Sequence, residues 1–464
     1  MSKVDRRRFL KYIGAGAIAV GGVTAGHYLY NSGLGQKPRV TIPTTSAITP
    51  ITETATMLDY PPYADFRYKP FYLCPTEQQT IEFTNTSYDL DGDPLRHTWL
   101  IDNREVSQER DYSAKLSQGE HLVDLRVSDG KQTRVKSGTV TVEPDQIYPA
   151  RQLHIEYKGM RYAACTFGPH YPSIPTPTEE AMNEQLDAIS NELGCNAIII
   201  TGGGQLPGKL IECAQLAIQK GFSRIYVQPC YVDATVDEVV DGVSELARRM
   251  RPLREISEAV VLMIGHELGL DTYGIIPGND WLERTQYQLE HRDWFETVRA
   301  KLPSLFARLI STCKKNYGYK IAYAAAIWEI DLVPWDDPVF ESVSSDAYLC
   351  DACGWGADWI VDHLQGLKRY RKPVNSSEWG CDTFSGAAKI AAFSPVYREQ
   401  NPYDENDQAD YVRRYCDMLN RARISGCFYT QYNEDYDKGY GLYNPVTRKR
   451  KKGFYMYKSY QRSA

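Results

Sequence analysis

The sequence predicts a multidomain protein in which a small β-sandwich precedes a (β/α)8 barrel. Its 464 residues are 42% hydrophobic and 24% charged, an ordinary globular composition with enough chain for a large core and a second domain. Over residues 63–146, short apolar segments alternate with clusters of turn residues, which is typical of antiparallel strands. Over residues 150–464, strand-like and helix-like segments alternate instead, and this pattern indicates a parallel sheet covered by helices.

Residues 1–30 are expected to be a targeting segment. Arg6, Arg7 and Arg8 precede a weakly apolar run over residues 12–25, and this start resembles a twin-arginine export signal. A membrane anchor is the alternative, although the run is short for a bilayer span. Residues 31–62 are rich in Thr and Pro and are predicted to form an extended linker. We therefore expect an extracytoplasmic protein that is secreted or tethered to the membrane by its N-terminal segment.

Four strand candidates fall within residues 63–146: TIEFTNTS, LRHTWLI, HLVDLRVSDG and SGTVTVEPD. The run DLDGDP at residues 89–94, followed by Trp99, resembles the polycystic-kidney-disease (PKD) type of immunoglobulin-like domain. The resemblance implies a spacer on a surface enzyme. Asp89, Asp91 and Asp93 alternate as Ca²⁺ ligands can, but the run is also ordinary turn chemistry, and both interpretations stay open.

Eight segments are predicted to be the barrel strands. They span residues 161–168, 195–201, 223–228, 258–265, 320–328, 342–349, 372–377 and 426–432. Several are near-continuous apolar runs, as parallel strands buried on both faces are. An open, doubly wound sheet is the alternative, but it would leave the two glutamates described next without a shared cleft.

Glu267 and Glu378 follow predicted strands four and seven. The carboxyl ends of all the strands of a (β/α)8 barrel meet at one mouth, where active sites lie. Two carboxyl groups across a cleft suit glycosidic bond cleavage, because one protonates the leaving oxygen while the other supports the positive charge that develops at the sugar carbon. The sequence therefore predicts both glutamates as catalytic residues.

The segment KPVNSSEWG at residues 372–380, with the positions of both glutamates, resembles the clan of retaining (β/α)8 glycoside hydrolases. The motifs IGHELG, GIIPG and SSEWGCDTFSGAA are similar to those of a barrel group labelled abortive-infection proteins. The resemblance implies a carbohydrate substrate, Glu378 as nucleophile and Glu267 as acid/base. Two features depart from the clan: His266 stands where Asn normally precedes the acid/base, and predicted strand two carries no Arg.

Aromatic and imidazole side chains near the predicted mouth are expected to bind the substrate. The chain is rich in aromatics, with 34 Tyr and 8 Trp, which slightly favours a sugar-binding surface. Any single ring can instead belong to the barrel packing. The candidates are His170, His266, Trp328, Tyr348, Trp379 and Tyr432.

Other site types find little support in the sequence. A net charge of −6 makes no basic field, so we expect no nucleic-acid partner. HELGL has Leu270 where a zinc-protease helix needs its second His, and we expect no cofactor or metal. The eleven cysteines include the pair Cys350 and Cys353, which fits a disulfide, half of a zinc site or two free thiols, with export favouring the disulfide.

These observations together predict an exported glycoside hydrolase-like protein that acts by a retaining two-glutamate mechanism. The alternative is a catalytically inactive glycan-binding or cell-surface interaction protein on the same barrel, which the two departures from the clan favour. An acid/base enzyme acting on another kind of substrate is a third interpretation.

Overall fold

The structure is a computed structural model that describes residues 60–69, 78–142, 148–167, 176–291, 293–434 and 436–463. The predicted targeting segment and residues 31–59 of the predicted linker lie outside these ranges, so both stay predictions. Among the helices in the described ranges, none has the length and apolar character needed to cross a bilayer.

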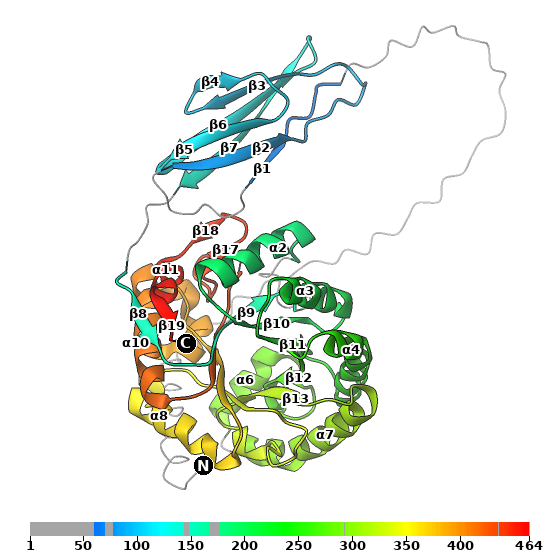
Figure 1. The fold of residues 1–464 in the computed structure, drawn as a ribbon, viewed down its shortest axis with the longest axis vertical. Helices are drawn as coiled ribbons and strands as arrows, with labels where there is room; N and C mark the ends of the chain where they lie inside the picture. The colour runs from blue at the N-terminus through cyan, green and yellow to red at the C-terminus, as the bar shows by residue number, and fades with distance from the viewer. Residues whose placement is uncertain are drawn as a thin grey trace, which may run out of the picture.

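Two antiparallel sheets form the N-terminal part (Figure 1). Inward-facing residues of both sheets, including Phe83, Trp99 and Leu125, form one buried cluster, because side chains alternate between the two faces of a strand. The PKD-type assignment of this part stays a prediction. One sheet contains β1 (Phe66–Lys69), β2 (Gln78–Asn85) and β5 (Tyr112–Ser117), and the other contains β4 (Arg104–Ser107), β3 (Arg96–Ile101), β6 (Gly119–Ser128) and β7 (Thr133–Val142).

The run DLDGDP forms a turn held by its own side chains. Asp89 Oδ1 accepts hydrogen bonds from the backbone N–H groups of Asp91 (2.8 Å) and Asp93 (3.1 Å). Asp93 also pairs with Lys131 at 3.0 Å. In the part of the chain that the structure describes, these three aspartates do not converge as metal ligands. These bonds are those of ordinary turn chemistry, and a Ca²⁺ site stays a prediction.

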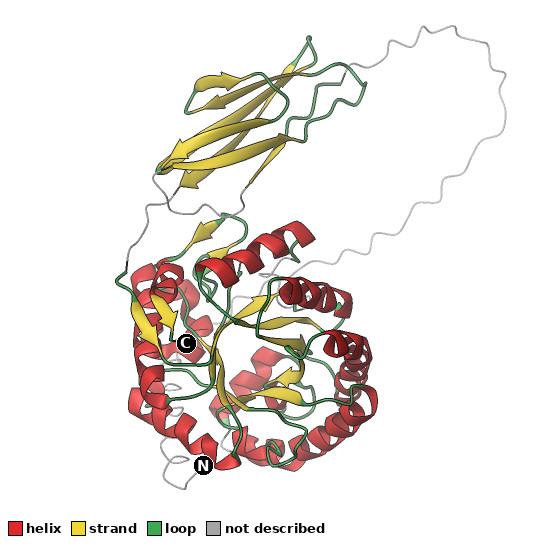
Figure 2. Cartoon of the chain, viewed as in Figure 1, coloured by secondary structure: helices red, strands yellow, loops and turns green. Residues whose placement is uncertain are grey.

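Eight parallel strands close into a barrel, each strand bonded to the next in the chain and the last bonded to the first (Figures 1 and 2). The predicted eight-stranded barrel is thus confirmed. The first strand starts earlier than predicted, at Tyr157, because Tyr157 already pairs with Gly426 of the last strand. The strands are β9 (Tyr157–Ala163), β10 (Ala197–Gly203), β11 (Arg224–Cys230), β12 (Val260–His266), β13 (Ile321–Ala326), β14 (Val343–Asp346), β15 (Val374–Trp379) and β16 (Gly426–Tyr429).

Helices surround the barrel (Figure 2). Their starts follow ordinary capping rules: Thr235 and Glu238 form a capping box at the start of α4. The long helices are α2 (Glu179–Asp187), α3 (Pro207–Gln219), α4 (Val236–Ile256), α6 (Trp281–Glu290), α7 (Trp294–Asn316), α8 (Ala357–Gly366), α10 (Glu405–Ala422) and α11 (Lys452–Ser459), and the short ones are α5 (Leu268–Asp271) and α9 (Ala387–Ile390).

The barrel interior has an apolar middle layer, between the Arg224–Glu341 pair near the amino ends of the strands and polar side chains at their carboxyl ends. Ile199, Tyr226, Met263 and Phe428 belong to a buried apolar cluster inside the barrel. The Phe428 ring fills the space beside Gly159, where an added Cβ would lie 2.2 Å from its Cδ1 atom. This packed floor leaves only the carboxyl ends of the strands for a site.

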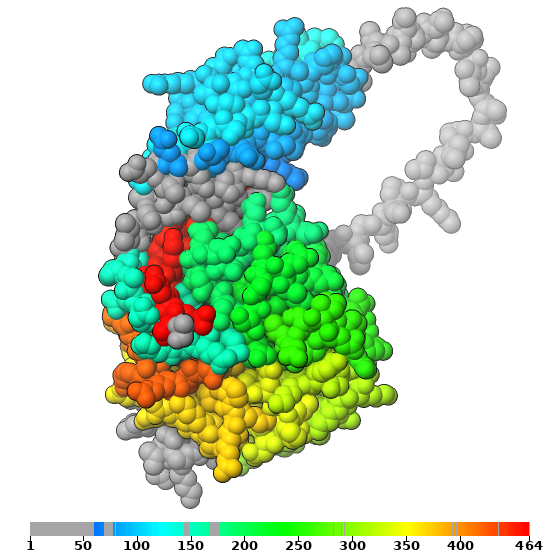
Figure 3. Space-filling view, viewed as in Figure 1, coloured from blue at the N-terminus to red at the C-terminus, as the bar shows by residue number. Residues whose placement is uncertain are grey.

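The C-terminal segment packs against the first barrel strand, near its amino end. Lys158 is buried there, and its Nζ donates to the backbone oxygens of Leu193, Tyr457 (3.0 Å) and Tyr460 (2.7 Å). The two-stranded sheet of β8 (Arg151–Leu153) and β19 (Tyr460–Arg462) lies beside it, and β17 (Tyr443–Asn444) pairs with β18 (Lys449–Arg450). In the space-filling view, the red C-terminal segment lies at the barrel surface beside cyan and green segments (Figure 3).

Candidate active site

Both predicted catalytic glutamates lie at the carboxyl end of the barrel. β12 ends at His266, directly before Glu267, and Glu378 is the fifth of the six residues of β15. Because all eight strands are parallel, the two glutamates share one mouth. The Glu378 side chain is 13% exposed.

Three side chains hold the Glu378 carboxylate, two from the strands β9 and β12 and one from the segment after β14. The Arg161 guanidinium contacts Oε2, and His266 Nε2 lies 2.9 Å from the same oxygen. The Tyr348 hydroxyl donates to Oε1. Arg161 is fixed in turn by Gln228, whose Oε1 accepts from its Nη2 at 2.7 Å. A carboxylate beside a guanidinium is favoured in its ionised form, the form that a nucleophile requires.

Arg161 is a site residue that the sequence did not predict. The sequence shows no Arg on strand two, and the structure supplies the guanidinium from strand one instead. The available signal was a charged residue between Met160 and Tyr162, in a mostly apolar strand that also contains Lys158. Arg161 is only 4% exposed, and a buried cation needs polar partners, which are a carboxylate for Arg161 and backbone oxygens for Lys158.

Glu267 sits in a different environment. Its backbone is left-handed, with φ 38° and ψ 44°, and the side chain is half-buried. The pKa of Glu267 is raised to about 7, and burial is the largest cause. The negative charges of Asp346 and Asp271 add to the rise, while the positive charges of His266 and Arg161 oppose it. A carboxyl group with this pKa still holds its proton in much of the population near neutral pH, as a general acid must.

His266 lies beside Glu378 and two aspartates. Its Nε2 lies 2.9 Å from Glu378 and 3.6 Å from Asp346, while Nδ1 lies 3.5 Å from Asp271. The pKa of His266 is raised above its usual value. Burial alone would lower this pKa, but the carboxylates of Asp271, Glu267 and Asp346 raise it by more. The imidazolium form therefore persists closer to neutral pH than in a free histidine, and it can donate to a carboxylate or to a bound hydroxyl group.

The same cluster contains the atoms best placed for a metal ion. His266 Nε2, Asp346 Oδ2 and Glu378 Oε2 lie within 4.8 Å of one another and are buried without a hydrogen-bond partner of good geometry. The Ser377 hydroxyl donates to the other oxygen of Asp346 at 2.8 Å. The Arg161 guanidinium, however, contacts the same Glu378 oxygen, and its fixed positive charge opposes a cation there.

The predicted substrate-binding residues have different surroundings. Tyr348 touches Glu378, and His266 lies in the cluster just described. Trp328 is half-buried, with its ring edge-on to Trp294 at 5.0 Å. His170 lies outside the described residues.

Trp379 and Tyr432 lie in the packing and not at the mouth. The Trp379 side chain is fully buried, stacked on Tyr415 of α10 at 4.3 Å between ring centroids. Trp379 therefore lies on the side of β15 that faces α10, as does Ser376, whose hydroxyl bonds to Tyr415, and the strand register is irregular between these two residues. Tyr432 is also fully buried and stacks on Tyr443 at 5.6 Å. Neither ring offers a free face to a sugar.

Replacing Trp379 by Leu is expected to reduce stability without weakening substrate binding. The change removes the stack on Tyr415 and leaves a cavity, so the free energy of unfolding should fall by about 2–4 kcal/mol. KM should stay within about twofold of the wild-type value. Denaturant unfolding and steady-state kinetics measure the two quantities. A large rise in KM at unchanged stability would restore Trp379 as a sugar platform.

The two cysteines after β14 form a disulfide, Cys350–Cys353. Of the three alternatives for this pair, the disulfide is therefore the one that the structure shows. The other cysteines in the described ranges are free and buried, as small apolar side chains are.

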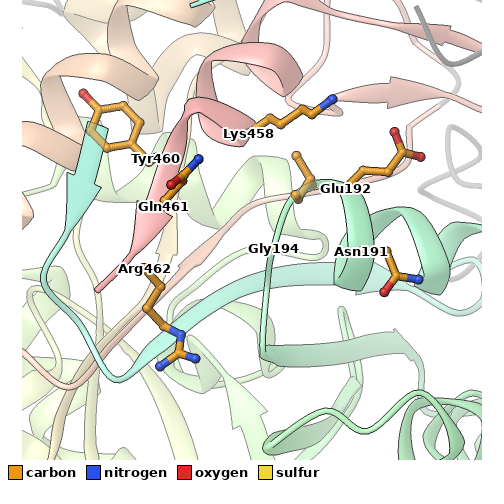
Figure 4. A pocket seen from close by; sticks show the side chains of 8 residues that line it. Asn191, Glu192, Gly194, Lys458, Tyr460, Gln461 and Arg462 are labelled. Atoms are coloured by element: carbon orange, nitrogen blue, oxygen red, sulfur yellow. The ribbon is translucent and has the colours of Figure 1, made fainter. Parts of the chain in front are cut away.

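A surface cavity of about 360 Å³ lies at the other end of the barrel (Figure 4). Residues 191–194, just before β10, form one wall, and Lys458 with residues 460–462 forms the other. Lys458 and Arg462 point in different directions (Figure 4). On a (β/α)8 barrel this end contributes to stability, and the carboxyl end holds the site.

Comparisons with known proteins give only distant similarities. No family model and no curated protein sequence matches the chain. A β-glucuronidase from Parabacteroides merdae aligns with 87% of this chain and 54% of its own, at 11% identity and TM-score 0.44. A broad-specificity GH5-4 endoglucanase from Clostridium acetobutylicum aligns with 66% of this chain and 96% of its own, at 12% identity and TM-score 0.43. The PKD1 domain of Vibrio anguillarum Epp aligns with 19% of this chain and 99% of its own, at 28% identity and TM-score 0.16.

The chain spans about half the length of the β-glucuronidase. Similarity at these TM-scores assigns no family. The basis for a function is therefore the cluster of side chains around Glu267 and Glu378.

Proposed function

We propose that the protein is a glycoside hydrolase that cleaves its substrate by a retaining mechanism, with Glu378 as nucleophile and Glu267 as acid/base. One observation carries the proposal: two carboxyl groups at the same mouth have opposite environments. Glu378 is held by Arg161, while burial raises the pKa of Glu267 to about 7. Carboxyl groups whose surroundings favour opposite protonation states are the arrangement that acid and nucleophile roles require.

The proposed reaction has two steps. In the first, a Glu378 oxygen bonds to the anomeric carbon while Glu267 gives its proton to the departing glycosidic oxygen. In the second, Glu267 takes a proton from water, and the hydroxide displaces Glu378 and restores the free carboxylate. This route requires the two carboxyl groups to be about 5 Å apart when substrate is bound. Arg161 and Tyr348 fix the carboxylate that attacks and later leaves.

The test is a screen of the purified protein against aryl glycosides and polysaccharides, followed by NMR of the first product. We expect hydrolysis of one sugar class and a product with the anomeric configuration of the substrate. An inverted product would overturn the retaining mechanism. Binding of a glycan without any turnover would favour the inactive glycan-binding alternative.

We propose also that the protein works outside the cytoplasm, with the N-terminal sheets as a PKD-type spacer. The sequence motif Arg6-Arg7-Arg8 and the two sheets that share one core support this arrangement. Fractionation of cells that produce the full chain, beside a variant with the three arginines replaced by lysine, tests it. The wild-type protein should be exported and the variant retained in the cytoplasm.

A further inference from the structure

A hydrogen-bonded clamp holds the turn that carries Glu267. The turn comprises Glu267 and the short helix α5, residues 267–271. The Tyr323 hydroxyl accepts from the backbone N–H of Leu268 at 2.8 Å. Glu329 Oε2 accepts from the N–H of Gly269 at 3.1 Å. The first two amides after Glu267 are thus bound by side chains of β13 and of the segment that follows it.

Glu329 and Tyr323 are also bound to each other. The Tyr323 hydroxyl and Glu329 Oε1 lie 2.5 Å apart, and the same carboxyl oxygen accepts from the N–H of Ala326 at 3.2 Å. Both side chains are completely buried. Burial raises the pKa of Glu329 to about 8, but the bond to Tyr323 survives either protonation state, because a hydroxyl group can accept as well as donate.

The space around the turn is as restricted as its hydrogen bonds. A Cβ atom added at Gly269 would lie 2.8 Å from Glu329 Oε2 and 2.8 Å from the Trp328 ring. The left-handed backbone of Glu267 costs on the order of 1–3 kcal/mol and persists only where its surroundings hold it. The clamp provides bonds that hold this conformation.

We propose that Glu329, acting with Tyr323, is a positioning residue that sets the orientation of Glu267 toward the leaving group. The kinetic part of this inference rests on the proposed function. Glu329 bonds to Tyr323 and to backbone amides and so acts through the turn, without a role in the bond-breaking step itself. Its effect should therefore fall on the step that needs proton donation and not on substrate binding.

Two variants test the clamp, Tyr323→Phe and Glu329→Gln. Tyr317→Phe is the matched control for the first, because it removes a buried hydroxyl that bonds to the Val260 oxygen at 3.3 Å, away from the turn. Glu341→Gln is the matched control for the second. Glu341 is a carboxylate at the amino end of the barrel, away from the turn, and its Oε2 lies 3.3 Å from Arg224 Nη1.

Hydrogen exchange tests the clamp without any substrate. Loss of one bond worth about 1.4 kcal/mol should speed exchange of the amide it protects about tenfold. We expect this at Leu268 in Tyr323→Phe and at Gly269 in Glu329→Gln, with unchanged rates in both controls. Unchanged exchange at both amides would overturn the clamp, whether or not the protein hydrolyses glycosides.

Kinetics with two leaving groups test the positioning role. An alkyl glycoside needs its departing oxygen protonated, whereas a dinitrophenyl glycoside does not. Both clamp variants should lose about 10- to 100-fold in kcat on the alkyl glycoside, keep kcat within about threefold on the dinitrophenyl glycoside, and keep KM within about twofold. Equal losses on both substrates would overturn the positioning role. A wild-type protein that hydrolyses neither contradicts the proposed function and the kinetic part of the inference, while the exchange rates still decide whether the clamp exists.

Discussion

Replacement of Glu378 by Gln is expected to reduce kcat/KM on an aryl glycoside by about 10⁴- to 10⁶-fold. The amide cannot form the glycosyl ester, so the route through a covalent intermediate closes. The loss should fall on kcat, because Gln has nearly the shape of Glu and leaves the cleft unchanged. Steady-state kinetics on the best substrate of the screen measure it.

Two further variants make this result decisive. Glu212→Gln removes a carboxylate on α3 that pairs with Lys209 and should leave the rate unchanged. Glu378→Asp keeps the charge beside Arg161 but withdraws the carboxylate from the sugar, so it should fold like the wild-type protein and lose at least about 10²-fold in kcat. A Glu378→Gln protein that folds and keeps wild-type turnover would remove Glu378 as nucleophile.

Replacement of Glu267 by Gln is expected to have an effect that depends on the leaving group. On an alkyl glycoside, kcat/KM should fall by about 10²- to 10⁴-fold, which is the usual contribution of a general acid. On a dinitrophenyl glycoside, the first step should stay close to the wild-type rate, because that leaving group departs without a proton. The pre-steady-state release of dinitrophenol measures this step.

The pH dependence gives a second measure of the same group. Glu267 must be protonated to act as an acid, and burial raises its pKa to about 7. Activity on the alkyl glycoside should therefore be high below pH 7 and fall about tenfold per pH unit above it. The descending limb should be absent in Glu267→Gln. A limb that remains in the variant would assign the titration to another group, such as His266, whose charge acts on Glu267.

Much of the barrel was predictable because its strands have a strong local signature. β10 and β12 are apolar runs bounded by turn residues, and both have bounds within two residues of those predicted. Their parallel arrangement then places Glu267 and Glu378 at one end without further information, since every strand of such a barrel ends at the same mouth. The start of β9 was harder to predict, because its first residues are defined by pairing with β16 and not by their own apolar character.

The side-chain contacts between strands could not be predicted from local patterns in the sequence. Arg161 and Asp346 reach the site from β9 and β14, which are far apart in the chain and carry no shared motif. Trp379 adjoins the nucleophile in sequence but points away from it, toward α10. The bonds from Tyr323 and Glu329 to the turn after Glu267 likewise join residues that are distant in the sequence.

The sequence by itself determined the eight strands and the end of the barrel at which both glutamates stand. Strand periodicity and chain order are enough for that, because they are local properties of the chain. Only the tertiary structure decided which side chains surround each glutamate, and therefore that Arg161 holds Glu378 while burial raises the pKa of Glu267. The physical reason is that burial and charge pairing depend on which strands and loops meet in space, and no local pattern in the chain specifies that meeting.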